Sequence, residues 1–228
     1  MFEIFNSGGV ILAYRAVLFD FDGVVAETLP YHVCAWQQVF SKFQVKIEYE
    51  DIALQEGQGA HLIVGALAKQ KGLKLSRAEL DALMAEKKEI YNQITRARIN
   101  PETGALISQL KNNNVPLALV TGAVMENLIP VTGEAFLKLF DAIITGDATP
   151  KNKPHPDPYL LAAKKLDVAP ADCIVIENAP LGIRAARSAG MFCIALKTTI
   201  QNEALLAEAD LIVESIARIP SRLLPVEK

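Results

Sequence analysis

The chain has 228 residues, of which 51% are hydrophobic and 21% charged, a composition typical of a globular protein with one large or two small domains. Its 23 basic and 26 acidic residues give a net charge of −3 with no basic block, which argues against nucleic acid or an anionic membrane as a partner. The three cysteines, Cys34, Cys173 and Cys193, have neither zinc-site spacing nor the even number of a disulfide framework, so the cytoplasm is the expected location.

Residues 1–13 contain a short apolar patch at 10–13. We interpret them as a frayed or edge-strand extension whose role is unknown. No stretch of the chain approaches the roughly 18 consecutive apolar residues of a membrane helix, so no membrane span is expected.

The first strong signal is an apolar run at 16–19 that ends in Asp20 and is followed by Asp22 and Gly23. The run is short and contains a β-branched residue, so it indicates a buried strand. In an open parallel sheet, ligands bind at the carboxyl ends of the strands, where this strand would deliver Asp20 and Asp22. Two carboxylates this close repel each other unless a cation lies nearby, and Mg²⁺ suits oxygen ligands. An ordinary Asp-Gly turn is the competing interpretation.

Residues 31–98 have the pattern of a helical insert and contain no confident strand. Pro30 can open a helix over 31–43, and a second helix is predicted over 61–70. Ser76 and Glu79 fit a capping box, which predicts a third helix from there.

From Pro101 onward, strands and helices alternate. Helices are predicted at 103–111, 124–139, 159–166 and 181–189. Strands are predicted at 115–120, 142–145, 173–176, 192–195 and 211–213. This alternation predicts an α/β fold with a Rossmann-like parallel sheet covered by helices on both faces. Residues 1–30 and 99–228 would form the core, and residues 31–98 a small α-helical cap inserted after the first strand.

Three of the later predicted strands or loops carry groups suited to a phosphate. Thr121, Gly122 and Ala123 would offer a hydroxyl and backbone N–H groups at a strand-to-helix junction. Lys153 lies in a loop held by prolines, and a carboxylate and an amide, Glu177 and Asn178, follow the next strand. With the two aspartates, this set suits Mg²⁺-assisted phosphoryl transfer through a carboxylate nucleophile.

Each of these groups also has an ordinary structural interpretation. Thr121 could cap a helix, Lys153 could be a solvated loop lysine, and Glu177 with Asn178 could form a polar turn. These groups all occur together in one chain, after predicted strands, and this combination favours the functional interpretation.

The segments Asp-Phe-Asp-Gly-Val, Lys-Pro-His-Pro-Asp and Glu-Asn-Ala-Pro-Leu-Gly, in this order, resemble the haloacid dehalogenase superfamily. The inserted helices resemble the cap of its β-phosphoglucomutase-like branch, and the resemblance extends over residues 15–215. It implies that Asp20 is the nucleophile that becomes an aspartyl-phosphate and that Asp22 is the general acid and base. The implied phosphate-binding residues are Thr121, Gly122, Ala123 and Lys153, with Lys153 also catalytic. The implied Mg²⁺ ligands are Asp20, Asp22 through its backbone carbonyl, Glu177 and Asn178.

Three positions in this chain need separate comment. Many relatives carry Asp where this chain has Asn178, and an amide lacks charge, so weaker metal binding or a direct ligand role for Glu177 is expected. His32 is expected either near the transferred group, where it would position Asp22, or packed against Trp36. Gly57 lies in a loop that resembles the substrate-facing loop of the cap.

The resemblance implies a Mg²⁺-dependent phosphatase for a small phosphorylated metabolite such as a sugar phosphate, acting as a monomer or weak homodimer. One alternative is a β-phosphoglucomutase-like phosphotransferase, although that enzyme carries an arginine in the cap loop and residues 56–61 contain none. A dehalogenase is a further alternative, but halide displacement needs neither a second aspartate nor a metal. A catalytically weak binding protein that has kept the fold is the last alternative.

Overall fold

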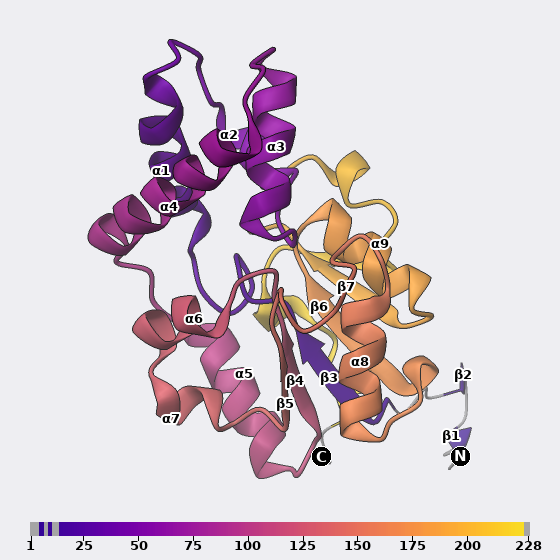
Figure 1. The fold of residues 1–228 in the computed structure, drawn as a ribbon. Coiled ribbons are helices and arrows are strands. Elements are labelled where there is room, and N and C mark those ends of the chain that lie inside the picture. Colours follow the sequence, from indigo (N-terminus) through magenta and orange to yellow (C-terminus); the bar gives the residue numbers. More distant parts are fainter. Residues whose placement is uncertain (1–4, 7–8, 11–13, 226–228) are drawn as a thin grey trace.

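A computed structural model describes residues 5–6, 9–10 and 14–225 of the chain. At its centre is a six-stranded parallel sheet with the strand order β5-β4-β3-β6-β7-β8 (Figure 1). Its strands are β3 (Ala16–Phe19), β4 (Leu117–Val120), β5 (Ala142–Ile144), β6 (Cys173–Glu177), β7 (Phe192–Leu196) and β8 (Leu211–Val213). The predicted parallel sheet is thus confirmed, and β3 lies between β4 and β6.

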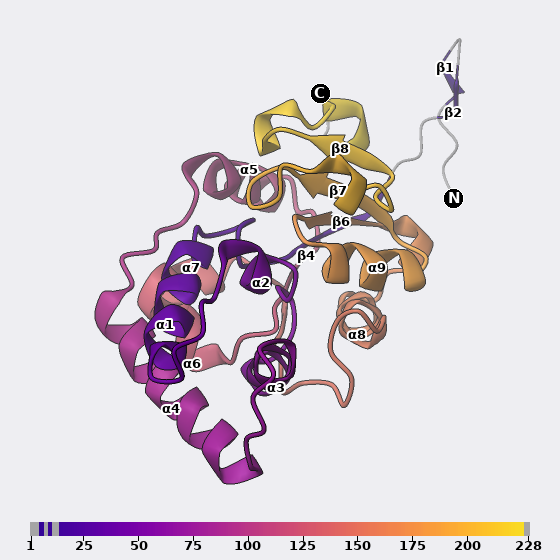
Figure 2. The same cartoon turned by 90° about the horizontal axis from the view of Figure 1, so that it is seen from above.

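The central strand β3 is buried on both faces, as its unbroken apolar run requires. Ala16 and Leu18 face the cluster that includes α8 (Asp157–Leu166) and α9 (Pro180–Ser188). Val17 and Phe19 face the cluster that includes α5 (Pro101–Asn112). Figure 2 shows α5 on one side of the sheet and α8 and α9 on the other. Helices therefore cover both faces of the sheet, as the sequence predicts.

Four helices gather at one end of the molecule, beyond the sheet (Figure 1). They are α1 (Leu29–Ser41), α2 (Tyr49–Ala53), α3 (Ala60–Gln70) and α4 (Arg77–Ile94). Helix α1 packs against α2 and α4, and α3 packs against α4. The segment 31–98 contains no strand, as expected, and its separation from the core as a cap remains a prediction. None of the helices in the described part of the chain is both long and apolar enough to cross a membrane.

Three local features of the structure differ from what the sequence predicts. The helix predicted over 124–139 is two helices, α6 (Met125–Thr132) and α7 (Glu134–Leu137), because Gly133 adopts a φ of +71°, which no helix contains. Helix α2 was not predicted, although Glu48 and Asp51 form its capping box. Of the two interpretations of residues 1–13, frayed or edge strand, the edge strand is wrong where it can be checked, because β1 (Phe5–Asn6) and β2 (Gly9–Val10) pair with each other in a separate sheet. The rest of residues 1–13 lies outside the described residues.

The remaining ordered segments are short 3₁₀ turns. They are Pro170–Asp172, Glu203–Leu205, Ile216–Arg218 and Ser221–Leu223. Ile216 and Ile219 are buried against the face of the sheet that α5 covers. This end of the chain therefore completes the core without contributing a further helix.

Candidate active site

Three strand ends meet around the ammonium group of Lys153, which is 2% exposed. Its Nζ donates to Asp20 Oδ1 at 2.5 Å, to Glu177 Oε1 at 2.8 Å and to the carbonyl of Val120 at 3.1 Å. Asp20 directly follows β3, Val120 ends β4 and Glu177 ends β6. The structure therefore brings together the carboxylates and the lysine that the sequence placed in one site.

The charges in this cluster shift the pKa of each partner. Burial alone would lower the pKa of Lys153, but the carboxylates of Asp20 and Glu177 outweigh it and raise that pKa above its ordinary value. Burial raises the pKa of Asp20 to about 8; Lys153 opposes this, and the charges of Glu177 and Asp22 add to it. One ammonium group thus does not fully compensate the carboxylates around it.

Glu177 uses both carboxylate oxygens to accept hydrogen bonds from the protein. Oε1 accepts from Lys153 and from the hydroxyl of Tyr159 at 2.7 Å, and Oε2 accepts from the N–H groups of Asn178 and Ala179. Helix α9 passes so close that a methyl group at Gly182 would lie 1.6 Å from Oε1. Tyr159 and Gly182 were not singled out from the sequence. Gly182 lies within the Glu-Asn-Ala-Pro-Leu-Gly segment, but Tyr159 carries no sequence signal.

Asp22 is held by side chains from the start of α1. Thr28 Oγ1 donates to Asp22 Oδ1 at 2.5 Å, and His32 Nε2 lies 3.5 Å from the same oxygen. Burial would raise the pKa of Asp22, but the contacts with His32 and Thr28 outweigh it and lower that pKa. His32 therefore lies beside Asp22, the first of its two expected positions.

His32 is fixed in turn by α4. Its Nδ1 lies 2.7 Å from Lys87 Nζ, and its ring stacks on Tyr91 with the centroids 4.2 Å apart. Because an ammonium group can only donate, Nδ1 accepts and the hydrogen lies on Nε2, facing Asp22. Burial, followed by the charge of Lys87, lowers the pKa of His32, although the contact with Asp22 opposes this. Lys87 was not predicted, because a lysine in an amphipathic helix normally faces solvent.

The turn after β4 packs against the loop between α2 and α3. Thr121 is buried, and its Oγ1 accepts from the N–H of Ala123 at 3.0 Å. A methyl group at Gly122 would lie 2.7 Å from the carbonyl oxygen of Gln58, and one at Gly57 would lie 2.8 Å from Lys153 Cδ. Gly57 therefore covers Lys153, and the backbone of this loop lies on the turn predicted to bind phosphate.

Asn178, which directly follows β6, contacts a carboxylate that the sequence did not reveal. Its Nδ2 donates to Thr199 Oγ1 at 2.9 Å and to Glu56 Oε2 at 3.3 Å. Burial, with the charges of Asp22 and Asp20, raises the pKa of Glu56 well above its ordinary value. Glu56 Oε1 and Asn178 Oδ1 are buried without a hydrogen-bond partner.

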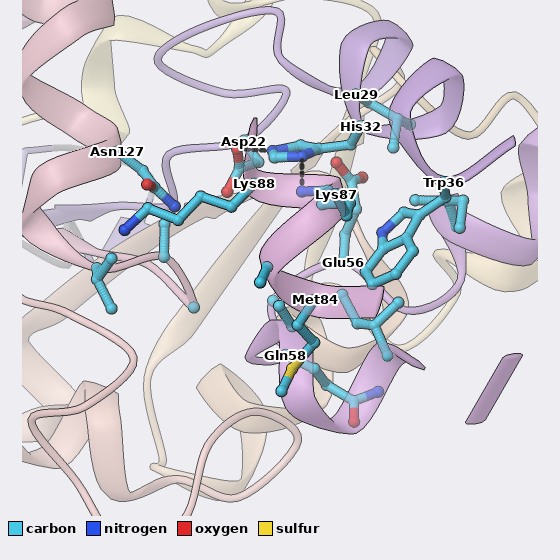
Figure 3. Close-up of a pocket in the computed structure, with 18 residues that line it drawn as sticks. Asp22, Leu29, His32, Trp36, Glu56, Gln58, Met84, Lys87, Lys88 and Asn127 are labelled. Atoms are coloured by element: carbon cyan, nitrogen blue, oxygen red, sulfur yellow. Dashed lines mark hydrogen bonds and ion pairs between the residues drawn. The ribbon is translucent and has the colours of Figure 1, made fainter. Parts of the chain in front are cut away.

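A cavity of about 300 Å³ opens beside Asp22. One wall is apolar and includes Leu29, Trp36, Ile52, Ile63 and Met84. Polar groups also line it, among them His32, Glu56, Gln58, Lys87, Lys88 and Asn127. In Figure 3 the His32 ring lies between Asp22 and Lys87, and Glu56 extends toward the end of the cavity at which they lie. The cavity is large enough for a small metabolite and ends at the predicted acid–base group.

The site fits a hard cation by the chemistry of its donors rather than by a preformed cage. Among the residues that the structure describes, no three His, Cys, Asp or Glu side chains are grouped to hold a metal ion. The unpartnered oxygens of Glu56 and Asn178 lie in the same buried region, and oxygen atoms are what Mg²⁺ takes as ligands. Asp20, the backbone carbonyl of Asp22 and Asn178, with Glu177 beside them, are therefore the groups that could hold such an ion.

Residues 14–190 match the model of the haloacid dehalogenase-like hydrolases. This chain belongs to that family. It is 33% identical to the β-phosphoglucomutase of Bacillus subtilis over 93% of this chain and 95% of the relative. It is 31% identical to the fructose-1-phosphate phosphatase of Escherichia coli, over 78% of this chain and 94% of the relative.

A solved structure gives the same result for the fold. The structure of CbbY from Rhodobacter sphaeroides in complex with phosphate superimposes with a TM-score of 0.78 and 27% identity, over 92% of this chain and 99% of that one. The resemblance inferred from the motifs is thus confirmed, including its β-phosphoglucomutase-like branch. Because a mutase and a phosphatase are almost equally similar, family membership does not choose between these two reactions.

Proposed function

We propose that this protein is a phosphatase that removes the phosphoryl group from a small phosphorylated metabolite through a phosphorylated Asp20. The observation that carries the proposal is the buried contact of 2.5 Å between Lys153 and Asp20, close to a cavity bounded by Asp22. Lys153 keeps Asp20 oriented and supplies positive charge where the transferring phosphoryl group would gather negative charge. The turn from Thr121 to Ala123 would bind the phosphoryl oxygens with the hydroxyl of Thr121 and the N–H of Gly122, since the N–H groups of Thr121 and Ala123 donate to the carbonyl of Ile144 and to Thr121 Oγ1.

In the first step, an oxygen of Asp20 attacks phosphorus and the bond from phosphorus to the ester oxygen breaks. Asp22 gives its proton to the departing oxygen, and a dianionic phosphoryl group beside Asp22 favours the protonated form that this step needs. In the second step, Asp22 takes a proton from a water molecule that attacks phosphorus. The bond between phosphorus and Asp20 then breaks, which releases inorganic phosphate and restores both aspartates.

Mg²⁺ is the proposed cofactor, and when bound it would neutralise charge on Asp20 and on the transferring phosphoryl group. Asp20, the backbone carbonyl of Asp22 and Asn178 are the proposed ligands, with Glu177 beside them. Because both oxygens of Glu177 already accept hydrogen bonds, Glu177 acts mainly by holding Lys153 in place.

A sugar phosphate is the proposed substrate class. The cavity is lined by Gln58 and Asn127, whose amide groups can bind hydroxyls, and by Trp36, which offers an apolar face. The names of the relatives support this choice, because one acts on fructose 1-phosphate and another is a phosphoglucomutase. The free cysteines, two of them buried, agree with the reducing cytoplasm as the proposed location.

The test is hydrolysis of p-nitrophenyl phosphate and of a panel of phosphosugars, with Mg²⁺ and with EDTA. Asp20→Asn removes the nucleophile without changing its shape, so we expect turnover to vanish while the unfolding midpoint stays close to that of the wild type. Asp81→Asn, on the exposed face of α4, is the matched control and keeps full activity. An Asp20→Asn protein that turns over at the wild-type rate contradicts covalent catalysis at this residue. An inactive wild type would favour a binding protein.

A mutase is the second candidate, favoured by the 33% identity to the Bacillus subtilis β-phosphoglucomutase. Residues 56–61 contain no arginine to hold a second phosphate, which supports the phosphatase instead. Incubation with β-glucose 1-phosphate and a trace of the bisphosphate distinguishes the two. A phosphatase releases inorganic phosphate, whereas a mutase accumulates glucose 6-phosphate.

A further inference from the structure

Glu56 is a buried acidic side chain for which neither the fold nor the proposed chemistry gives a role. It lies in the loop between α2 and α3 and is only 6% exposed. Asn178 Nδ2 donates to Oε2 at 3.3 Å, the hydroxyl of Thr199 lies beside the carboxylate, and Oε1 has no partner. A buried carboxylate without compensation is costly, so a residue of this kind normally has a cation or several donors beside it.

Neither of the two buried lysines of the site supplies that compensation. Lys153 directs its ammonium group to Asp20, Glu177 and the carbonyl of Val120, and these contacts use its three donors. Lys87 contacts His32 Nδ1. Within the described residues, Asn178 Nδ2 and the hydroxyl of Thr199 are the donors beside the carboxylate of Glu56, and neither carries a charge.

Asn178, like Glu56, has a buried oxygen without a hydrogen-bond partner. Its Nδ2 is used twice, toward Glu56 and Thr199, while its Oδ1 is fully buried and accepts nothing. Two side chains in direct contact thus each leave one oxygen unpartnered. Oxygen atoms without donors are acceptors for a cation or a water molecule, and the residue that follows β6 is the amide that lacks the charge of an aspartate.

We propose that Glu56 supplies the negative charge that Asn178 lacks, and that it completes the divalent-cation site of this protein from the loop between α2 and α3. The inference rests on the proposed function, because it assumes that Mg²⁺ binds beside Asp20. It adds a ligand from the helical segment to a site otherwise built from the ends of the strands. A protonated Glu56 could still accept from Asn178 Nδ2 through one oxygen, but its hydroxyl on Oε1 would have no acceptor.

Glu56 belongs to the loop that covers the site, so cation binding and the position of this loop depend on each other. The next residues of the loop, Gly57 and Gln58, lie against Lys153 and Gly122. Glu56 can therefore reach the cation only when this loop lies on the strand ends. Mg²⁺ would hold the loop closed over the phosphate-binding turn.

The test is isothermal titration calorimetry with MgCl₂, which measures binding without turnover. Glu56→Gln keeps the shape and removes the charge, so we expect the affinity for Mg²⁺ to fall by about 10- to 100-fold. The matched control Glu50→Gln, an exposed position on α2, binds Mg²⁺ as the wild type does. Amide hydrogen exchange over residues 55–59 gives a second readout. Mg²⁺ slows it in the wild type but not in Glu56→Gln.

Asn178→Asp tests the compensation directly. If Glu56→Gln folds poorly, Glu56→Asp, which keeps the charge but shortens its reach, takes its place in both backgrounds. Restoring a charge after β6 raises the Mg²⁺ affinity, and in that background Glu56→Gln costs much less than it does in the wild type. Equal affinities of the wild type and Glu56→Gln, or an equal cost of Glu56→Gln in both backgrounds, overturn this inference and leave the proposed phosphatase intact. A wild type that binds no Mg²⁺ while hydrolysing phosphate esters in EDTA overturns the inference together with the proposed cofactor.

Discussion

Lys153 is the side chain at which the buried charges of the site meet. Its ammonium group joins Asp20 to Glu177, and Tyr159 adds a hydroxyl donor to the Glu177 oxygen that Lys153 contacts. A buried ion pair with satisfied hydrogen bonds contributes little net stability, but it fixes the geometry of its members. Lys153 therefore serves to hold the nucleophile and to keep a positive charge within reach of the phosphoryl group.

Lys87 is a second buried lysine, but no carboxylate forms a hydrogen bond with its ammonium group within the described residues. Burial lowers its pKa to about 8 from the ordinary 10.5, although the charge of Asp22 opposes this. Between these two pH values the unfolded chain binds more protons than the folded protein. The wild type is therefore stabilised as the pH rises through this window, by up to about 1.4 kcal/mol per pH unit from this group.

Lys87→Met removes that titration, because methionine fills a similar volume without a charge. We expect the variant to be more stable than the wild type near pH 7, and the difference to shrink toward pH 10. Urea unfolding of both proteins at the two pH values measures it. A stability difference that is constant or grows with pH contradicts the assignment of a buried, charged Lys87.

At the scale of the elements, helix α9 shows a conflict between local propensity and the site. Alanine normally stabilises the interior of a helix relative to glycine, by roughly 0.5–1 kcal/mol. At Gly182, however, the new methyl group would lie 1.6 Å from Glu177 Oε1. At Gly65, inside α3, it would meet no atom within 4 Å.

Gly182→Ala and Gly65→Ala form a matched pair with opposite expected signs. Gly182→Ala displaces the carboxylate that holds Lys153, so we expect a stability loss of about 1–3 kcal/mol and a large loss of turnover. Gly65→Ala gains about 0.5–1 kcal/mol and keeps its activity. Chemical denaturation and initial rates measure both. A Gly182→Ala protein as stable and active as Gly65→Ala would rule out this packing.

The strands of the central sheet could be predicted from the sequence, whereas two features of its helices could not. Short apolar runs predicted every strand of the central sheet, because strands buried on both faces consist of little else. The break between α6 and α7 was missed, because apolar spacing continues across Gly133 while its backbone leaves the helical region. Helix α2 was missed because five residues are too few to show a periodic pattern.

At the scale of the whole molecule, the turn after β4 and the loop between α2 and α3 form a close backbone contact. A methyl group at Gly122 would lie 2.7 Å from the carbonyl oxygen of Gln58 and 2.8 Å from that of Gly57. We expect Gly122→Ala to push the loop away and to lower kcat/KM by about 10- to 100-fold. The unfolding midpoint should stay close to that of the wild type, and Gly65→Ala, the control, should keep its kcat/KM. Unchanged kinetics in Gly122→Ala would show that the loop does not need this contact.

The sequence also predicted which distant segments come together, because parallel strands deliver their carboxyl ends to one edge of the sheet. Asp20, Thr121, Lys153 and Glu177 follow from that rule. Glu56 and Lys87 do not, because they reach the site from a loop and a helix of the segment 31–98, whose orientation over the sheet has no local signature. Gly57 was predicted only through the family resemblance.

The phosphorylation of Asp20 is the central claim, and it is tested most directly by trapping it. Asp22→Asn leaves the nucleophile in place but removes the base that activates water, so the phosphoryl group should accumulate on the protein. The measurement is mass spectrometry of peptides from this variant after a brief incubation with p-nitrophenyl phosphate, whose nitrophenolate departs without the proton that Asp22 gives to a sugar oxygen. The account predicts one added phosphoryl group on Asp20. A phosphoryl group on another residue, or none while the variant still releases phosphate, contradicts it.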